Sequence, residues 1–329
     1  MNRIALLIAT ATLLLPLLFA CSSTPPPSHH IQLLLDWKAQ MEHAGFFVAR
    51  QKGYYQADGL TVDILDGSGA PTTARLVGNS TYPLGVSSGS ATVLARDQNI
   101  PVVSLAVINQ HSPVVVYSLE ETGIRKPEDL VGKRIGVNIG GTKYREFQAF
   151  LKKVGIPESR IELIGMTESS PAPLLAGQVD AMLGYTEDQP VTVELRGRAV
   201  NRIALADHGI DLYSTNIIAH EAYLKKNPDT VRKFVRASLK GWQYAVDHPD
   251  EALAAYMAER PESDPVFNRA NFAKLTPILY SPDVEKLGLG AQTHARWTHT
   301  RDVLFDLEMI GRKVEIAELF TNVFLPSQP

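Results

Sequence analysis

The sequence predicts an α/β protein with two lobes, and three observations support this. Short apolar runs, such as residues 31–35, alternate with longer segments of helical spacing. A chain of 329 residues is long enough for two lobes of ordinary size. Strand-to-helix turns rich in Ser, Thr or Gly recur at 87–90 and 140–142, so the same kind of turn occurs in both predicted lobes.

The stretch that begins at residue 31 predicts one wall of a pocket. Residues 31–35 read as a buried strand, and Asp36 and Trp37 follow at its carboxyl end. A helix with apolar residues 46–49 comes next and ends at Gly53, a typical C-terminal glycine. Because ligands of open α/β sheets bind outside the carboxyl ends of strands, we expect a carboxylate and an aromatic ring to face a ligand there.

The two recurring turns predict further pocket residues. Glycines and small hydroxyl residues before a helix leave backbone amides free, and the helix dipole adds to their attraction for an anion or a ring heteroatom. An ordinary serine N-cap is the alternative for the first turn. Neither turn is a P-loop, since no Lys-Ser/Thr pair follows at the required spacing. The residues placed in the pocket on this ground are Ser87, Ser88, Ser90, Gly140, Gly141 and Thr142.

The N-terminus predicts export and lipidation. Residues 1–20 combine an early arginine with an apolar run and read as a signal peptide. Cys21, the only cysteine, ends a Leu-Phe-Ala-Cys sequence that resembles a bacterial lipobox. Residues 21–30 form a Ser/Pro-rich tether, and we expect its histidines, His29 and His30, to be exposed rather than metal ligands. An acylated Cys21 would leave no thiol for a disulfide or a nucleophile.

Composition and motifs exclude several classes of function. The net charge is −3 and no basic block stands out, which argues against a nucleic-acid surface. No hydrolytic set of residues assembles, and no His-Glu-x-x-His sequence is present. We therefore expect no enzyme, no cofactor and no metal.

The opening stretch carries a family resemblance. Its strand ending in Asp-Trp, its His-x-Gly turn and its helix closed by Lys-Gly-Tyr-Tyr resemble the NMT1/THI5-like family, and the resemblance extends to about residue 244. That family comprises substrate-binding proteins of ABC importers and relatives that handle the thiamine pyrimidine, and it is related to sulfonate, nitrate and taurine binders. The residues that carry the match are Asp36, Trp37, His43, Gly45, Lys52, Gly53, Tyr54 and Tyr55.

A second resemblance concerns the fold. Residues 130–137 read L-V-G-K-R-I-G-V and resemble the start of the second lobe of a type II periplasmic binding protein. This implies two α/β lobes joined by a two-crossover hinge, with the ligand cleft between them. We expect lobe 1 to comprise residues 31–117 and 217–329, and lobe 2 residues 118–216.

The family resemblance also implies ligand contacts. It places them at the end of the strand 181–183, where Tyr185 could stack on a planar ring and Glu187 could accept two hydrogen bonds. Glu187 could instead be a glutamate that starts a helix. His43 is either structural or a ligand donor, and Asn216 lies on the return crossover beside the cleft.

The function that we predict is that of a lipid-anchored substrate-binding protein of an ABC importer. It would be a monomer on the periplasmic side of a bacterial membrane, where it would meet a permease with its ATPase. The ligand class is a thiamine-precursor pyrimidine of the formylamino- or hydroxymethyl-aminopyrimidine type. Trp37 and Tyr185 would sandwich the ring, and Asp36 and Glu187 would bind its amino groups.

Alternatives remain open at this point. The two turns could bind the anion of a sulfonate, taurine or nitrate, or the site could hold a larger ring such as riboflavin. A sensor that signals through a membrane receptor is a third option. A THI5-type pyrimidine synthase is disfavoured, because the turn at 87–90 offers no lysine or histidine to hold pyridoxal phosphate, and the mature chain has no cysteine.

Overall fold

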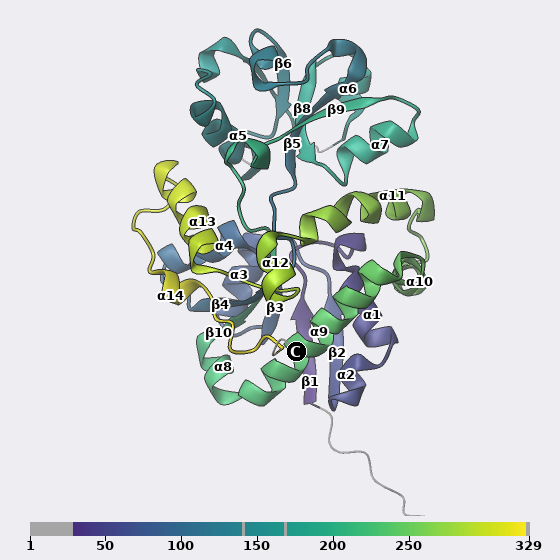
Figure 1. Cartoon of the computed structure of the whole chain (residues 1–329), viewed down its shortest axis with the longest axis vertical. Coiled ribbons are helices and arrows are strands. Elements are labelled where there is room, and N and C mark those ends of the chain that lie inside the picture. Colours follow the sequence, from purple (N-terminus) through teal and green to yellow (C-terminus); the bar gives the residue numbers. More distant parts are fainter. Residues whose placement is uncertain (1–28, 140–141, 168–169, 327–329) are drawn as a thin grey trace, which may run out of the picture.

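The computed structural model describes residues 29–139, 142–167 and 170–326, and they form two lobes, each built on a five-stranded sheet. Figure 1 shows one lobe above the other, with two connecting segments running between them. The predicted two-lobed α/β fold is therefore confirmed. The predicted signal peptide, Cys21, the tether up to residue 28, and the Gly140–Gly141 pair lie outside the described residues.

The sheet of the first lobe has the strand order β2-β1-β3-β10-β4. β1 pairs in parallel with β2 and β3, whereas β10 runs antiparallel between β3 and β4. Parallel strands that end at one edge bring their following loops together, which is where the sequence placed a ligand. The strands are β1 (His29–Leu34), β2 (Leu60–Leu65), β3 (Leu84–Ser88), β4 (Val102–Val107) and β10 (Thr215–His220).

The sheet of the second lobe repeats this plan with the order β7-β6-β8-β5-β9. Here β5 is the antiparallel member, paired with β8 and β9. Each lobe thus contains one strand that runs against its neighbours and lies next to a link between the lobes. The strands are β5 (Val114–Leu119), β6 (Arg134–Val137), β7 (Glu162–Gly165), β8 (Ala181–Tyr185) and β9 (Val200–Ala204).

Helices cover both sheets and are more numerous in the first lobe. Those of the first lobe are α1 (Ala44–Gln51), α2 (Tyr54–Ala57), α3 (Ala70–Gly78), α4 (Gly89–Asp97), α8 (Glu221–Lys226), α9 (Pro228–Asp247), α10 (Pro249–Glu259), α11 (Pro265–Leu275), α12 (Pro282–Leu287), α13 (His294–Asp306) and α14 (Ile316–Leu319). Those of the second lobe are α5 (Thr142–Lys153), α6 (Ala172–Leu175) and α7 (Gln189–Leu195). The 3-10 helices are η1 (Met41–His43), η2 (Glu120–Thr122), η3 (Pro127–Leu130), η4 (Glu158–Arg160), η5 (Ala206–His208) and η6 (Thr276–Leu279). Within the described ranges, no helix has the length and apolar character needed to span a bilayer.

Two of the expected boundaries are wrong. β5 begins at Val114 and pairs only within the second sheet, so the chain enters the second lobe before residue 114 rather than after residue 117. The return is complete by Thr215, where β10 joins the first sheet. The tether is also shorter than expected, because His29 and His30 already belong to β1 and His30 Nε2 lies 2.8 Å from Asp63 Oδ2. Strand pairing, which one sequence does not reveal, decides all three positions.

An ionic cluster ties the two connecting segments to the first lobe. Asp211, on the second segment, accepts hydrogen bonds from His111 Nδ1 at 2.7 Å and from the Ser112 backbone N–H at 3.1 Å on the first. Arg296 of α13 donates to the same carboxylate at 2.5 Å. Burial alone would raise the pKa of Asp211, but the hydrogen bonds and charges of His111 and Arg296 lower it to about 2. The two segments therefore form one hinge that α13 holds in place.

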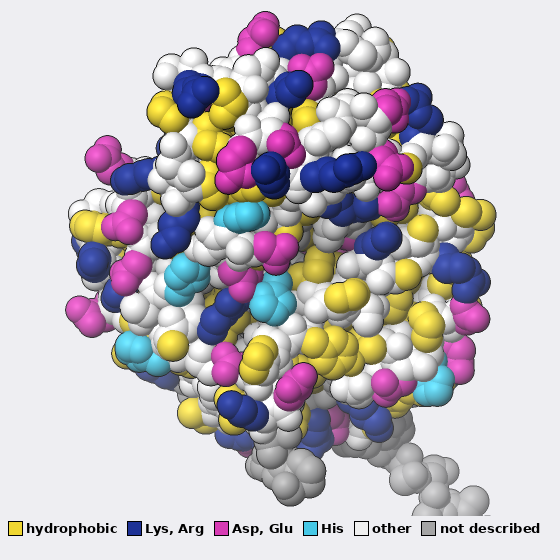
Figure 2. Space-filling model, turned by 45° about the horizontal axis from the view of Figure 1, so that its top comes forward, with side chains coloured by type: hydrophobic (Ala, Val, Ile, Leu, Met, Phe, Trp, Pro, Cys, Tyr) yellow, Lys and Arg dark blue, Asp and Glu magenta, His cyan; other side chains and the backbone are white. Residues whose placement is uncertain are grey.

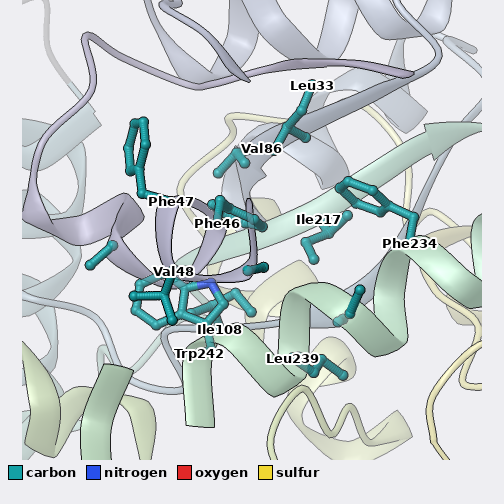
Figure 3. Packing of buried hydrophobic residues seen from close by; sticks show 14 of the residues in the cluster. Leu33, Phe46, Phe47, Val48, Val86, Ile108, Ile217, Phe234, Leu239 and Trp242 are labelled. Carbon is teal, nitrogen blue, oxygen red and sulfur yellow. The ribbon is translucent and has the colours of Figure 1, made fainter. Parts of the chain in front are cut away.

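Residues of the family-like motif pack in the core of the first lobe. Phe46 meets Trp242 edge to face, with ring centroids 5.9 Å apart, as Figure 3 shows. A Cβ at Gly45 would lie 2.3 Å from Trp242 Cγ, so only glycine lets α1 approach α9 this closely. Tyr55 is buried, stacks on Phe234 and shares a 2.9 Å hydrogen bond with another α9 side chain, Ser238. The motif thus fixes α1 and α2 on α9.

We predict that Gly45→Ala destabilises the protein by about 1–3 kcal/mol, because the added methyl overlaps the indole of Trp242 in a closely packed core. Denaturant unfolding of the lipid-free chain measures this. The matched control is Gly311→Ala, whose Cβ would meet nothing within 4 Å. Equal unfolding midpoints for the two variants would contradict the packing argument.

Candidate ligand-binding site between the lobes

A cavity of about 430 Å³ lies between the lobes, at the edge where the predicted pocket residues gather. Both lobes and the hinge contribute to its wall. The residues from the first lobe are Asp36, Trp37, Gln40, Glu42, Gly69, Ala70, Pro71, Ser88, Ser90, Ala91, Leu94, Thr215 and Asn271. Those of the second lobe and the hinge are Asn109, Ser112, Pro113, Val114, Thr142, Lys143, Glu146, Tyr185, Glu187, Asp188, Gln189, Leu212, Tyr213 and Ser214.

The loop after β1 delivers a carboxylate and an indole to the cavity. Asp36 and Trp37 both line it, and Trp37 is 48% exposed, unlike the core tryptophans. The backbone of this loop is fixed by two hydrogen bonds. The Asp36 carbonyl accepts one from the Gly69 N–H at 2.6 Å, and the Trp37 carbonyl accepts one from the Gly67 N–H at 2.9 Å. The indole is therefore presented by a fixed backbone and has an accessible face for a planar ligand.

His43 does not line the cavity; it is fully buried behind it and positions Asp36. Its Nδ1 accepts the Gln40 backbone N–H at 3.2 Å, so the neutral ring carries its proton on Nε2 and donates it to Asp36 Oδ1 at 2.7 Å. Burial opposes a charge on His43, but the bond to Asp36 and the charges of Asp36 and Glu42 outweigh it and raise its pKa. Of the two roles left open by sequence, this geometry supports the structural one.

Asp36, Glu42 and His43 place ligating atoms within 4.8 Å of one another, the geometry of a small metal site. Hydrogen bonding argues against that use. A metal on His43 Nε2 would displace the proton that Asp36 accepts, while Nδ1 is already an acceptor. The ring would then carry no proton at all, whereas a neutral imidazole ligand keeps one proton on its second nitrogen.

The serine turn divides into cavity and framework residues. Ser88 and Ser90 line the cavity, and Ser88 also caps α4 by accepting the Ala91 N–H at 3.2 Å. Ser87 points the other way along β3, and its hydroxyl donates to the Ala70 carbonyl at 3.0 Å. Asn216 is buried beside it, with its amide bonded to Thr92 at 3.0 Å. Placing Ser87 and Asn216 in the cavity wall was wrong, because alternate strand residues face opposite sides.

The second lobe contributes three acids (Glu146, Glu187 and Asp188), an aromatic ring and an amine. Tyr185 and Glu187 line the cavity as predicted, and so does Thr142 at the start of α5. Lys143 Nζ lies 4.2 Å from the centroid of the Tyr185 ring, a cation–π distance. Glu146, one turn further along α5, accepts a hydrogen bond from Ser112 of the hinge at 3.0 Å.

The cavity wall holds more acidic than basic groups, and burial makes their ionisation costly. Five carboxyl groups line it, Asp36, Glu42, Glu146, Glu187 and Asp188, against the single amine of Lys143 among the described residues. Burial, with repulsion from Glu42 and Asp188, raises the pKa of Glu187 to about 8. Burial likewise raises the pKa of Glu42 and of Glu146 to about 7 and lowers that of Lys143. This cavity therefore favours a ligand that donates hydrogen bonds or carries positive charge.

Sequence reasoning found about a third of the polar and aromatic wall. It named Asp36, Trp37, Ser88, Ser90, Thr142, Tyr185 and Glu187, all of which line the cavity. It missed Glu42 and Lys143, although each adjoins a residue that it did name, and a closer look at those neighbours could have found them. It also missed Asn271 of α11, for which the sequence carries no signal.

Two α/β lobes around a ligand-sized cavity define the periplasmic binding protein fold. A solved structure with this fold, the periplasmic aliphatic sulphonate binding protein SsuA from Escherichia coli, is similar with a TM-score of 0.69. The comparison covers 88% of this chain and 91% of that one at 14% identity, and so it concerns the fold alone.

The model of the NMT1/THI5-like family matches residues 40–252, and the chain belongs to that family. It is 28% identical to the riboflavin-binding protein RibY of Chloroflexus aurantiacus over 92% of this chain and 87% of that protein. It is 25% identical to a formylaminopyrimidine-binding protein of Halalkalibacterium halodurans over 95% and 97%. A relative from Legionella pneumophila, 28% identical over 91% and 93%, is a 4-amino-5-hydroxymethyl-2-methylpyrimidine phosphate synthase. The family therefore contains both binding proteins and enzymes.

We predict that stability falls as pH rises from about 5 to 8 and that Glu187→Gln reduces this fall. The folded pKa of Glu187, about 8, lies above its ordinary value of 4.5, so the folded state binds the proton more tightly and loses this advantage as pH rises. The difference between wild type and variant should be on the order of 1–3 kcal/mol across this range. Denaturant unfolding at several pH values measures it.

The matched control for this prediction is Glu285→Gln, on an exposed position of α12. It should follow the wild-type pH profile. A Glu187→Gln profile parallel to that of wild type would show that the carboxyl of Glu187 titrates as in water.

Proposed function

We propose that this protein is the substrate-binding component of an ABC importer, which closes its lobes on a small ligand and delivers it to a permease and its ATPase. The two-lobed fold, the hinge and the cavity between the lobes support a capture role. Two relatives that match over most of their length are named as binding proteins. Their ligands differ, so the cavity must decide the ligand class.

The ligand class that we propose is a thiamine-precursor pyrimidine of the formylamino- or hydroxymethyl-aminopyrimidine type. One observation carries this choice: Glu187 is 3% exposed, lines the cavity, and leaves its Oε2 without a hydrogen-bond partner. Such an oxygen calls for a donor, and an aminopyrimidine edge supplies one. Trp37 and Tyr185 offer rings for stacking on the pyrimidine, and Asp36 offers a second acceptor.

An anion such as nitrate or an alkanesulfonate suits the cavity poorly. Five carboxyl groups line it, and each one that is ionised would repel an anion in a site of low dielectric constant. Lys143 alone does not offset them, because burial lowers its own pKa. The similarity to sulfonate-binding structures is therefore a similarity of fold.

We propose binding rather than catalysis. The turn after β3 contains Ser87, Ser88 and Ser90 and no lysine, so a pyridoxal phosphate aldehyde has no amine to react with there. Lys143 is the cavity lysine of the described residues, and it comes from the second lobe. A synthase reaction would need a different arrangement of these groups.

Riboflavin is a second candidate ligand. The observation that favours it is the similarity to a riboflavin-binding protein over 92% of this chain. Trp37, half exposed at the cavity wall, could stack on the larger flavin ring as well as on a pyrimidine.

We predict that an aminopyrimidine at about a hundred times its dissociation constant stabilises the lipid-free chain by roughly 2.7 kcal/mol, a shift of several degrees in Tm. Trp37→Ala should abolish this shift, since the stacking surface is lost. Thermal-shift assays with the two pyrimidines, riboflavin, taurine, an alkanesulfonate and nitrate measure it. Tyr280→Ala, an exposed aromatic outside the cavity, is the control and should keep the shift. A shift with riboflavin alone would replace the pyrimidine as ligand, and one with nitrate or sulfonate alone would overturn the acidic-site argument.

The lipid anchor is part of the proposal. We propose that Cys21 is acylated after removal of residues 1–20 and holds the protein at the periplasmic side of a bacterial membrane.

We predict that Cys21→Ala moves the protein from the membrane fraction to the soluble fraction on cell fractionation. Equal distribution of variant and wild type would contradict the anchor. A sensor that reports ligand occupancy to a membrane receptor would share this anchor. Deletion of the permease would leave the signal of such a sensor intact.

A further inference from the structure

The cavity lacks hydrogen-bond donors for its own buried acceptors. Three side-chain oxygens that belong to its wall have no partner: Glu187 Oε2, Asn271 Oδ1 and Asn109 Oδ1. The exposed fractions of these residues are only 3%, 4% and 1%. Among the described residues, the unpartnered buried atoms of this wall are two amide oxygens, which accept hydrogen bonds, and a carboxyl oxygen, which accepts them when ionised. Leaving each without a donor costs free energy, so a complementary ligand must be rich in N–H groups.

Helix α11 packs against the elements that carry one cavity acid from each lobe. It packs against η1, which carries Glu42, and against α7, which follows Glu187. Asn271 of α11 donates to the Glu187 backbone carbonyl at 2.7 Å, which connects the lobes directly. Figure 1 shows α11 running along the underside of the second lobe, close to α7. Glu42 and Glu187 are consequently near enough that the charge of Glu42 adds to burial in raising the pKa of Glu187.

The charges around this pair do not neutralise it. Glu42 also faces Asp36 and Asp188, which repel its charge, and His43, which is already bonded to Asp36. Glu187 faces the like charge of Asp188. It also faces Lys143, whose amine lies over the Tyr185 ring and whose pKa is lowered by burial.

Helix α11 adds no free cation from its own charged residues. Arg269 pairs with Asp250 on α10, and Lys274 acts on Glu194 of α7. Burial nevertheless outweighs the attraction of His43, whose Nε2 lies 3.8 Å from Glu42 Oε1, and that of Lys143. It raises the pKa of Glu42 to about 7 and that of Glu187 to about 8.

We propose that Glu42 and Glu187 together bind the positively charged, N–H-rich edge of a nitrogen base, an amidinium-type group, and that Glu42 is thus a ligand-binding residue. This rests on the proposed function and adds the charge state of its ligand. An aminopyrimidine presents such an edge once its ring nitrogen takes a proton from solvent. The amino group and the ring N–H then donate to one carboxylate from each lobe, which also draws the lobes together.

The experiment compares two probes of equal shape, benzamidine, which is cationic, and benzamide, which is neutral. Both contain a flat ring for Trp37 and Tyr185, and only the charge and the N–H count of the edge differ. Isothermal titration at pH 7.5 with the lipid-free chain gives their dissociation constants. We expect benzamidinium to bind wild type at least about tenfold more tightly than benzamide, because charge-assisted hydrogen bonds exceed neutral ones.

The variants test the role of each acid. Glu42→Gln and Glu187→Gln keep the size of the side chain, and each should remove most of the preference for benzamidinium. The control Glu285→Gln on α12 should retain it. Equal affinity of wild type for both probes, no binding of either probe, or an unchanged preference in both variants would overturn the proposal. Two variants are used so that a folding defect in one does not decide the outcome.

A titration of the aminopyrimidine separates this inference from the proposed function. In buffers with different ionisation enthalpies at pH 8, binding should take up about half a proton, because the ring nitrogen gains one while Glu187, half protonated at its pKa of about 8, releases about half. Glu42→Gln should take up less. Preference for benzamidinium without any pyrimidine binding would overturn the pyrimidine as ligand and leave the cationic site standing. Pyrimidine binding without proton uptake and without preference for benzamidinium would overturn the cationic site and leave the pyrimidine as ligand.

Discussion

The hydrogen bond between His43 and Asp36 connects the core of this protein to its cavity. His43 is completely buried at the start of α1, and its ring holds the Asp36 carboxylate at the end of β1. Helix α1 in turn lies against α9 at a distance that only Gly45 permits. The position of the ligand-facing carboxylate, and of Trp37 beside it, therefore depends on core packing that no ligand touches. This explains why one short motif contains both packing residues and cavity residues.

Charge governs the relation between the lobes. Each lobe presents carboxyl groups to the cavity, and Lys143 is the one amine among the described cavity residues. Repulsion between acids of opposite lobes, Glu42 and Glu187, opposes closure when both are ionised. A ligand that brings N–H donors or positive charge reverses the sign of this interaction. Ligand recognition and lobe closure are then the same electrostatic event, because the acids that bind the ligand are those that repel each other without it.

The acidic cavity also shows how one fold accommodates different ligands. The sulphonate binder SsuA shares the architecture at 14% identity, and relatives named for riboflavin and for formylaminopyrimidine share the family. The framework features here, such as the antiparallel strand in each sheet and the hinge around Asp211, do not specify a ligand. Specificity lies in the side chains at the strand ends, which can change without disturbing the sheets.

Local pattern determined much of this protein by itself. The alternation of strands and helices, the Gly53 helix end, and the pocket positions of Asp36 and Trp37 follow from residues that are neighbours in sequence. The family resemblance added Tyr185 and Glu187. Only the tertiary structure decided the rest. It moved the lobe boundary ahead of β5, turned Ser87 and Asn216 away from the cavity, and brought Glu42 and Asn271 to Glu187. The reason is physical: strand pairing, the facing of alternate strand residues and the packing of α11 across both lobes depend on contacts between segments far apart in the chain, which one sequence does not record.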